Sequence, residues 1–384
     1  MSAVREVHIV GAGPAGLAAA LTVARAGGRA IVHEQRAQVG ARFHGDFQGI
    51  ENWTTPADAL EELARIGIEP TFECRPFREG IFYDPEGREF SYRSPDPLFY
   101  LVRRGSAAGT LDRSLEEQAL ARGISIRFRE PCARLPEGGI VAGGPRGPDT
   151  IAVGYLFETD LADGIFGVLS DRLAPKGYGY LLVSGGRGTV ASCLFDDFHR
   201  EKLYRERTVE FFRGKVGLSM RNAVPFGGAC NVLFPRSARN GNVLFAGEAA
   251  GFQDALWGFG IRLAMLSGHL AARAILEEAP ETYDLLWRRR LGGVLRASIV
   301  NRFLYRRMGD RGYVHLMRRI ARARDARLWL RRHYRAGVWK SLLFPLARRA
   351  VHSHRAEPAC PADGCGCTWC RSHGALRREA PAAS

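Results

Sequence analysis

The sequence of 384 residues lacks any apolar run long enough to span a bilayer. A spanning helix needs about 20 mostly apolar residues, and the longest late candidate, residues 338–351, is interrupted by Lys340, Pro345 and two arginines. We also expect no cleavable leader, because the first apolar run, residues 7–10, leads directly into a glycine motif. We therefore expect a cytoplasmic protein whose scattered cysteines are reduced thiols.

Acidic residues are scarce toward the C-terminus. Residues 287–355 hold 20 Arg and Lys but only two acids, Asp310 and Asp325. Their net charge of +18 exceeds the +15 of the whole chain, so the remaining residues are net acidic. Such a basic segment favours a polyanionic partner, which is an anionic lipid surface, a nucleic acid or an acidic protein. No nucleic-acid-binding module accompanies the charge, and this disfavours nucleic acid.

Apolar and aromatic residues are interleaved with these arginines between residues 318 and 346. Basic residues, aromatics such as Trp329 and Trp339, and an apolar stripe are typical of a helix lying on a membrane surface. The same pattern is typical of a helix whose stripe packs on its own domain while its arginines face solvent. The first interpretation predicts a peripheral protein at the inner face of the membrane.

A glycine motif lies within a predicted β-α-β unit at residues 4–36, and its members are Gly11, Gly13, Pro14, Ala15 and Gly16. Gly11 permits a tight turn, Gly13 lets the backbone approach a pyrophosphate, and Gly16 lets the helix pack closely on the strand. Glu34 ends the second predicted strand, where a carboxylate can accept hydrogen bonds from the adenosine ribose. The motif predicts a bound dinucleotide.

The chain has no second motif of this kind, which disfavours a permanent NAD(P)H-binding domain. Electrons for a reduction must then come from a donor that binds only transiently. We expect this donor to be NAD(P)H or an electron-carrier protein such as reduced ferredoxin.

A second glycine-rich segment follows a predicted strand at residues 242–246. It contains Gly247-Glu248-Ala249-Ala250-Gly251 and then Gly258-Phe259-Gly260-Ile261, which opens an Ala-rich helix. With these motifs, residues 4–278 resemble the geranylgeranyl reductase branch of the FAD-dependent, p-hydroxybenzoate hydroxylase-type oxidoreductases. The resemblance implies FAD, with Gly247 and Glu248 near its ribityl–phosphate region and with Gly258, Gly260 and Ile261 against the flavin.

The resemblance also covers Arg103-Arg104-Gly105, where the family places an arginine on the cofactor. It implies this role for Arg104, and we expect Arg42 to be a further cofactor contact. The sequence departs from the family pattern mainly on the substrate side. The family's Asn-Pro is Asp254-Ala255, its Ala-Asp-Gly is Ala142-Gly143-Gly144, and its Tyr-x-Trp-x-Phe-Pro falls on residues 178–183.

Three polar residues are candidate catalytic groups: His44, Tyr178 and Tyr180. If an alkene is reduced, hydride leaves the flavin and a nearby acid must deliver a proton. His44 stands where the family has a reactive-looking cysteine. Each residue also has a structural interpretation, because His44 can serve a loop and the two tyrosines alternate along a strand and can line a wall.

Four cysteines lie within 11 residues near the C-terminus: Cys360, Cys365, Cys367 and Cys370. Thiolates this close are natural ligands for zinc or iron. The spacing is neither that of a zinc ribbon nor that of a ferredoxin. Structural zinc, an iron–sulfur cluster and a redox-active thiol set therefore all stay open.

The predicted fold is α/β, with a Rossmann-type, GR2-like FAD-binding domain, an inserted β-rich substrate domain and a helical C-terminal region. The boundaries expected are 1–150 for the first part of the FAD domain with short substrate-domain excursions, 151–235 for the substrate domain of strands and turns, 236–280 for the second part, 281–355 for the basic helices and 356–384 for the cysteine tail. Residues 136–150 are expected to form a loop because they are rich in Gly and Pro.

The function predicted is an FAD-dependent reductase or dehydrogenase of a hydrophobic small molecule, isoprenoid or quinone-like, at an anionic membrane surface. One alternative is an FAD-dependent monooxygenase of the same superfamily. Another is a flavin electron-transfer module with a metal-bearing cysteine tail, which would bind an electron-carrier protein and turn over no substrate.

Overall fold

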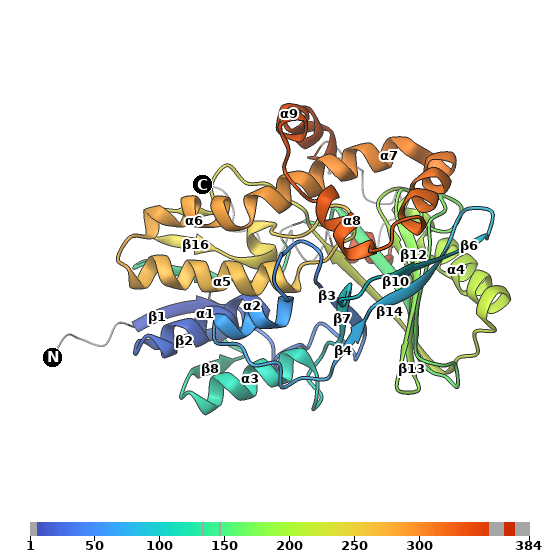
Figure 1. Cartoon of the computed structure of the whole chain (residues 1–384). Coiled ribbons are helices and arrows are strands. Elements are labelled where there is room, and N and C mark those ends of the chain that lie inside the picture. Colours follow the sequence, from blue (N-terminus) through green and yellow to red (C-terminus); the bar gives the residue numbers. More distant parts are fainter. Residues whose placement is uncertain (1–5, 133, 146, 353–364, 373–384) are drawn as a thin grey trace.

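The computed structural model describes residues 6–132, 134–145, 147–352 and 365–372. A six-stranded sheet, at the left of Figure 1, has the order β15-β16-β9-β1-β2-β8. All its neighbouring strands pair in parallel except β15 with β16. The bounds are β1 Glu6–Val10, β2 Arg29–Glu34, β8 Ser125–Phe128, β9 Gly139–Val141, β15 Arg239–Asn240 and β16 Val243–Phe245.

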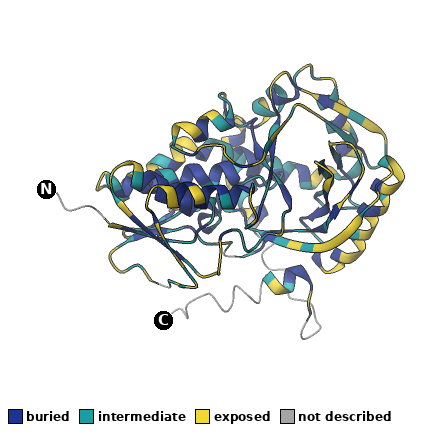
Figure 2. Ribbon diagram, turned by 90° about the horizontal axis from the view of Figure 1, so that it is seen from below, coloured by how far each residue is buried: buried dark blue, intermediate teal, exposed yellow. Residues whose placement is uncertain are grey.

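Two helices with many small residues cross this sheet, α1 (Pro14–Arg25) and α5 (Ile261–Leu276). They approach closely at Gly268, which has no side chain. A Cβ atom there would lie 2.0 Å from the Ala15 carbonyl oxygen. Seen from below, both helices are largely buried (Figure 2). With α2 (Ala59–Arg65) and α3 (Leu111–Ala121) they bury one apolar core against the sheet.

A seven-stranded sheet forms the right-hand part of Figure 1, with the order β14-β10-β13-β12-β11-β5-β6. Its bounds are β5 Glu79–Tyr83, β6 Glu89–Arg93, β10 Thr150–Glu158, β11 Gly164–Val168, β12 Tyr178–Ser184, β13 Arg187–Leu194 and β14 Arg221–Cys230. A three-stranded sheet, β3-β7-β4, adjoins it, with bounds β3 Phe47–Glu51, β4 Cys74–Phe77 and β7 Phe99–Arg103. Strands β11 to β14 lie within residues 151–235, where the sequence predicted strands and turns.

Two expectations about local structure are wrong. Residues 201–216, predicted as strands and turns, form helix α4 (Glu201–Val216), whose Val209 and Phe212 pack on the seven-stranded sheet. The predicted loop 136–150 contains β9, which pairs with β1 and β16 at the centre of the six-stranded sheet. A strand of three residues beside glycines carries almost no local signal, because its pairing partners define it.

Four helices follow α5 and cover the upper side of the molecule in Figure 1: α6 (Tyr283–Arg290), α7 (Gly292–Ala321), α8 (Ala326–His333) and α9 (Val338–His352). Helix α7 kinks at Gly309, where the backbone has φ 58°. The chain also forms short 3-10 helices at η1 (Phe198–Arg200), η2 (Gly247–Ala250) and η3 (Pro280–Thr282). Among the described residues, no helix combines the length and the apolarity that crossing a membrane requires.

The structure divides the predicted surface stripe into two parts. Helix α8 packs inward, because Arg327 is buried and donates to the carbonyl oxygens of Asn52 and Ala57. Helix α9 instead leaves a row of apolar side chains exposed. Only α9 therefore keeps the surface that the sequence pattern suggested.

Candidate active site

A cavity of ≈ 2460 Å³ lies between the six-stranded and seven-stranded sheets and is lined by residues of both. Pockets for one small ligand usually measure about 300 to 1,000 Å³. The cavity therefore has room for a dinucleotide and a second molecule beside it.

The start of helix α1 forms one end of this cavity. Gly13 is the N-cap residue, and no described side chain caps the helix. A side chain at Gly13 would meet nothing within 4 Å, whereas one at Gly16 would strike the Gly11 carbonyl oxygen at 1.9 Å. Free N–H groups and a positive helix end beside open space fit a diphosphate.

Glu34 lies next to this turn at the end of β2. Its Oε2 accepts a hydrogen bond from the Ala12 N–H at 2.8 Å, and its Oε1 accepts one from the Arg36 N–H at 2.9 Å. A carboxylate has about four lone-pair positions, so each oxygen keeps capacity for a ribose hydroxyl. The carboxylate also lines the cavity, which fits the adenosine half of a dinucleotide.

A second helix start faces the cavity at α5. Its N-cap residue is Gly260, no described side chain caps it, and Gly258, Gly260 and Ile261 all line the cavity. The preceding loop adopts a left-handed turn at Gly258, with φ +77°. The turn at η2 brings Glu248 to the same wall, beside Gly247, whose φ is +60°.

Arg42 and Glu248 form an ion pair across the cavity wall, with Nη1 and Oε2 2.6 Å apart. The other Arg42 nitrogen donates to the Ala229 carbonyl oxygen. Both charged side chains are about one quarter to one third exposed, so they can also contact a bound group. These residues belong to segments more than 200 positions apart, and the fold brings them together.

Of the two neighbouring arginines, only Arg104 lines the cavity. Its guanidinium is buried and donates to both carboxylate oxygens of Asp112 at 2.8 Å and to Gln48 Oε1 at 2.9 Å. Arg103 instead pairs with Glu73. The Arg104 guanidinium also lies over Phe43, with its carbon 4.0 Å from the centre of the ring.

The donor set fits FAD at both ends. The uncapped start of α1 and the open face of Gly13 suit the diphosphate, and Glu34 suits the ribose. The second uncapped start, at α5, opens onto the same cavity. The residues that line the cavity therefore fit FAD.

The three candidate catalytic residues all line the cavity, but they differ in their contacts. His44 is exposed, and its backbone N–H donates to Asp46. The Tyr178 hydroxyl donates to the Trp257 carbonyl oxygen. The Tyr180 hydroxyl has no hydrogen-bond partner in the described part of the chain. Burial raises the pKa of both tyrosines, so both keep their protons at neutral pH.

The loop that precedes α5 depends on Asp254, a residue that sequence reasoning noted only as a departure from the family pattern. Its carboxylate accepts from the N–H groups of Leu256 and Trp257 at 3.1 Å and from the Tyr334 hydroxyl at 2.8 Å. Burial raises the pKa of Asp254 to about 6. Asp254 therefore ties the glycine loop to the C-terminal helices.

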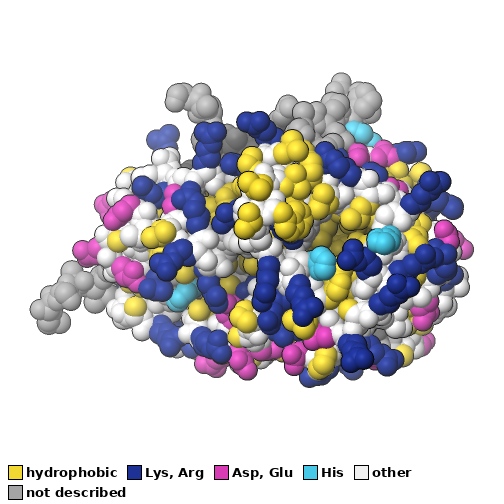
Figure 3. Space-filling model, turned by 45° about the horizontal axis from the view of Figure 1, so that its top comes forward, with side chains coloured by type: hydrophobic (Ala, Val, Ile, Leu, Met, Phe, Trp, Pro, Cys, Tyr) yellow, Lys and Arg dark blue, Asp and Glu magenta, His cyan; other side chains and the backbone are white. Residues whose placement is uncertain are grey.

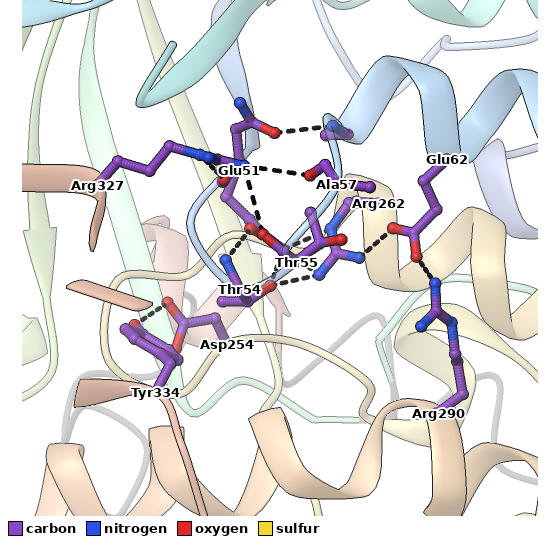
Figure 4. A network of polar contacts seen from close by, with 12 residues as sticks. Glu51, Thr54, Thr55, Ala57, Glu62, Asp254, Arg262, Arg290, Arg327 and Tyr334 are labelled. Atoms are coloured by element: carbon purple, nitrogen blue, oxygen red, sulfur yellow. Dashed lines mark hydrogen bonds and ion pairs between the residues drawn. The ribbon is translucent and has the colours of Figure 1, made fainter. Parts of the chain in front are cut away.

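A buried ionic network fixes the start of α5 (Figure 4). Arg262 lies between Glu51 of β3 and Glu62 of α2 and contacts both. Thr54 also accepts from Arg262, and Arg290 reaches Glu62 from the solvent side. Nothing local in the sequence indicates that these charges meet, because their partners are about 200 residues away.

The part of the cavity beyond Tyr178 and Trp257 is apolar. Its wall combines strands β5 to β7 with helices α7 and α8, in a cluster around Tyr178 that the seven-stranded sheet shares with the C-terminal helices. The apolar members that also line the cavity are Trp53, Phe82, Tyr92, Leu98, Phe99, Leu169, Trp257, Phe259, Met317, Ile320, Ala326 and Leu330. This region suits an extended hydrocarbon.

Three of the four predicted metal ligands lie together, since the sulfur atoms of Cys365, Cys367 and Cys370 are all within 4.8 Å of one another. Cys360 lies outside the described residues. The neighbouring residues Gly366 and Thr368 line the same cavity.

Comparisons with known proteins agree with this geometry. Residues 6–48 match the FAD binding domain family. The chain is 24% identical over 350 residues to a digeranylgeranylglycerophospholipid reductase of Methanosphaerula palustris, covering 74% of this chain and 81% of that protein.

Solved structures share the fold. A geranylgeranyl bacteriochlorophyll reductase-like protein of Thermoplasma acidophilum superposes with a TM-score of 0.68 at 18% identity, over 91% of this chain and 99% of that one. A flavin-dependent brominase superposes with a TM-score of 0.61 at 14% identity, over the same shares. The architecture is therefore common to reductases and to flavin enzymes of other chemistry.

Proposed function

We propose that this FAD-dependent oxidoreductase, which belongs to the geranylgeranyl reductase-like branch of its superfamily, reduces carbon–carbon double bonds of an isoprenoid chain carried by a membrane lipid. The observation that carries the proposal is the apolar region of the cavity, which continues directly from the FAD site. Its wall consists largely of aromatic and aliphatic side chains from β5 to β7, α7 and α8. A flexible hydrocarbon can lie there with one double bond near the flavin end.

Reduced FAD supplies the hydride in such a reduction. We assign the proton to Tyr180, because this residue lines the cavity and its hydroxyl donates to no described acceptor. Burial holds its pKa high, so the proton is present at neutral pH. Tyr178 is a positioning residue, because its hydroxyl is already bonded to the Trp257 carbonyl oxygen in the glycine loop.

Helix α9 is the surface that we propose for membrane contact. Val338, Leu342 and Leu346 recur every four residues and are 80%, 78% and 57% exposed, and Trp339 beside them is 55% exposed. Figure 3 shows hydrophobic side chains gathered on this side of the molecule with Lys and Arg around them. An exposed apolar face with a basic surround is typical of helices at an anionic lipid surface.

The position of α9 supports delivery of substrate from the bilayer. Helix α9 packs on α7, with Phe344 and Val351 in the same apolar cluster as Ile299 and Phe303. Met317 and Ile320 of α7 line the apolar region of the cavity. Helix α7 therefore connects α9 to the apolar region of the cavity, because it packs on the first and lines the second.

The electron donor that we propose is transient, either NAD(P)H or a reduced ferredoxin-type protein. The described residues hold one dinucleotide turn of the Gly11–Gly16 kind, and FAD occupies it in this proposal. Stopped-flow reduction of the bound FAD by each donor separates the two, since only a true donor bleaches the flavin within a turnover.

The test is an anaerobic assay with the FAD-loaded protein, reduced flavin and vesicles that carry a geranylgeranylated lipid. Mass spectrometry should show products that have gained two hydrogen atoms per double bond. Tyr180→Phe should lower turnover about 10²- to 10⁴-fold while the flavin spectrum is unchanged. Product that contains oxygen or halogen and forms only with O₂ would contradict the proposal.

Membrane contact is tested separately by vesicle flotation. Leu342→Ser with Leu346→Ser should reduce binding to anionic vesicles, because both leucines lie on the exposed face of α9. Leu285→Ser is a matched control, since Leu285 is 56% exposed on α6. Equal binding by the wild type, the Leu342→Ser, Leu346→Ser double variant and Leu285→Ser would refute the role of α9. That result would leave the proposed redox chemistry unaffected.

A further inference from the structure

Three thiols near the C-terminus form a cluster that the FAD chemistry does not use. The sulfur atoms of Cys365, Cys367 and Cys370 all lie within 4.8 Å of one another. Cys367 is buried, and the other two are half-buried. Three thiolates this close together repel one another strongly unless a cation or protons neutralise their charge.

The sulfur spacing indicates how many metal ions the cluster can hold. At a Zn–S distance of about 2.3 Å, two sulfurs on one tetrahedral ion lie about 3.8 Å apart. In a four-iron cluster each thiolate binds a different iron, so its sulfurs lie farther apart than those sharing one ion. An upper limit of 4.8 Å therefore favours a single tetrahedral ion.

A backbone contact fixes the position of one of these sulfurs. The Cys370 N–H donates to the Cys367 sulfur at 3.4 Å, within a Cys-x-x-Cys turn. The turn therefore holds the Cys367 sulfur close to the residue that carries the next thiol.

The cluster is anchored to the rest of the protein by the residues between the cysteines. The Thr368 N–H donates to both carboxylate oxygens of Glu201, at 3.0 and 2.9 Å. The Trp369 ring stacks on Phe198 with centroids 3.9 Å apart. Gly227 of the edge strand β14 leaves room for Thr368, because a side chain there would meet its hydroxyl at 2.4 Å.

We propose that Cys365, Cys367 and Cys370 bind one zinc ion, which fixes residues 365–372 as part of the cavity wall. The three thiolates occupy three of the four tetrahedral positions. Gly366, Thr368, Arg371 and Ser372 line the same cavity as the FAD-binding residues. Zinc has no redox chemistry, so the ion holds the wall in place and takes no part in electron transfer.

The first test measures metal in the purified full-length protein. Elemental analysis should find one zinc per chain, and replacement by Co²⁺ should give the visible absorption of a tetrahedral thiolate site. Cys367→Ser and Cys370→Ser should each lower zinc content at least tenfold. Cys132→Ser, which removes a thiol outside the cluster, should leave zinc content unchanged.

Two results would overturn the inference. Iron with acid-labile sulfide would assign an electron-transfer cluster instead, and protein without metal that gives no Co²⁺ spectrum would leave only thiols. Loss of zinc to a chelator should also speed proteolysis within residues 365–372, and unchanged proteolysis would refute the anchoring role. None of these readouts depends on turnover, so they are independent of whether the isoprenoid proposal holds.

Discussion

Replacing Arg262 with leucine tests the account of how the flavin end of the site is fixed. The Arg262 side chain is 4% exposed and lies between Glu51 and Glu62, which are equally buried. Its Nε donates to Glu51 at 2.7 Å. In the leucine variant Glu62 keeps Arg290, but Glu51 is left as a buried charge that, within the described part of the chain, keeps only the hydrogen bonds from Thr54.

Removing one partner of a buried ion pair costs about 3 to 5 kcal/mol. We expect Arg262→Leu to lose stability in this range in urea unfolding followed by tryptophan fluorescence. Since Arg262 directly follows the Gly258–Ile261 segment, FAD affinity should fall as well. Adding Glu51→Gln should restore most of the stability, because a neutral amide at position 51 leaves no unpaired charge in the interior.

Arg290→Leu is the matched control for this experiment. Arg290 contacts the same Glu62, but its side chain is 51% exposed. An exposed ion pair contributes about 0 to 1 kcal/mol, so this variant should remain close to wild type. The reasoning is refuted if the two arginine variants lose equal stability, or if Glu51→Gln fails to rescue Arg262→Leu.

The remaining predictions concern the cofactor turn and pH. Gly13→Ala should fold normally, because its methyl group meets no protein atom, but it should weaken FAD binding about tenfold because the methyl group enters the space expected to hold the diphosphate. Gly16→Ala should fail to fold, because its methyl group would strike the Gly11 backbone. Fluorescence titration with FAD measures the first effect and circular dichroism the second. Burial raises the pKa of Asp254 from 3.8 to about 6, so the protonated carboxyl stabilises the folded protein below pH 4. The free energy of unfolding should therefore fall by about 3 kcal/mol as the pH rises from 4 through 6. Asp254→Asn should abolish this dependence, and an unchanged pH profile in that variant would contradict the assignment. Burial lowers the pKa of His269 from 6.5 to about 4, so stability should fall as pH drops from 6.5 through 4; His269→Gln should remove that loss in the same denaturation series.

The turns of the nucleotide half of the site can be predicted from the sequence because their signals are local. Gly11, Gly13 and Gly16 stand at fixed offsets between a strand and a helix, and the turn geometry that needs them is complete within a few residues. The same holds for Gly258 and Gly260 at the start of α5. Such motifs carry their own structural context and can be recognised without the rest of the fold.

The residues that support the site are not predictable in this way. Arg327 and Tyr334 belong to a basic, aromatic segment and look like surface residues, yet both are buried. Arg327 satisfies backbone carbonyls of residues 52–57, and Tyr334 bonds Asp254. Their environment is set by chain segments about 80 to 275 residues away, which the spacing of residues within one helix cannot reveal.

Helix α4 was missed for a different reason. Its buried residues Tyr204, Thr208 and Phe212 do recur every four positions, so a helical period is present. Charged residues dominate the rest of the helix, and the strands on either side suggested a continuous β region. Here the periodicity was available, and the neighbouring pattern obscured it.

The close packing of Gly268 on Ala15 has a consequence for how the chain is made. Helix α1 emerges early from the ribosome, but α5 and strand β16 follow more than 200 residues later. At about 5 to 20 residues per second, roughly 10 to 50 s pass before they arrive. During that interval the small-residue face of α1 has no partner helix, so a nascent or truncated chain that ends before α5 should be a substrate for chaperones and prone to aggregate.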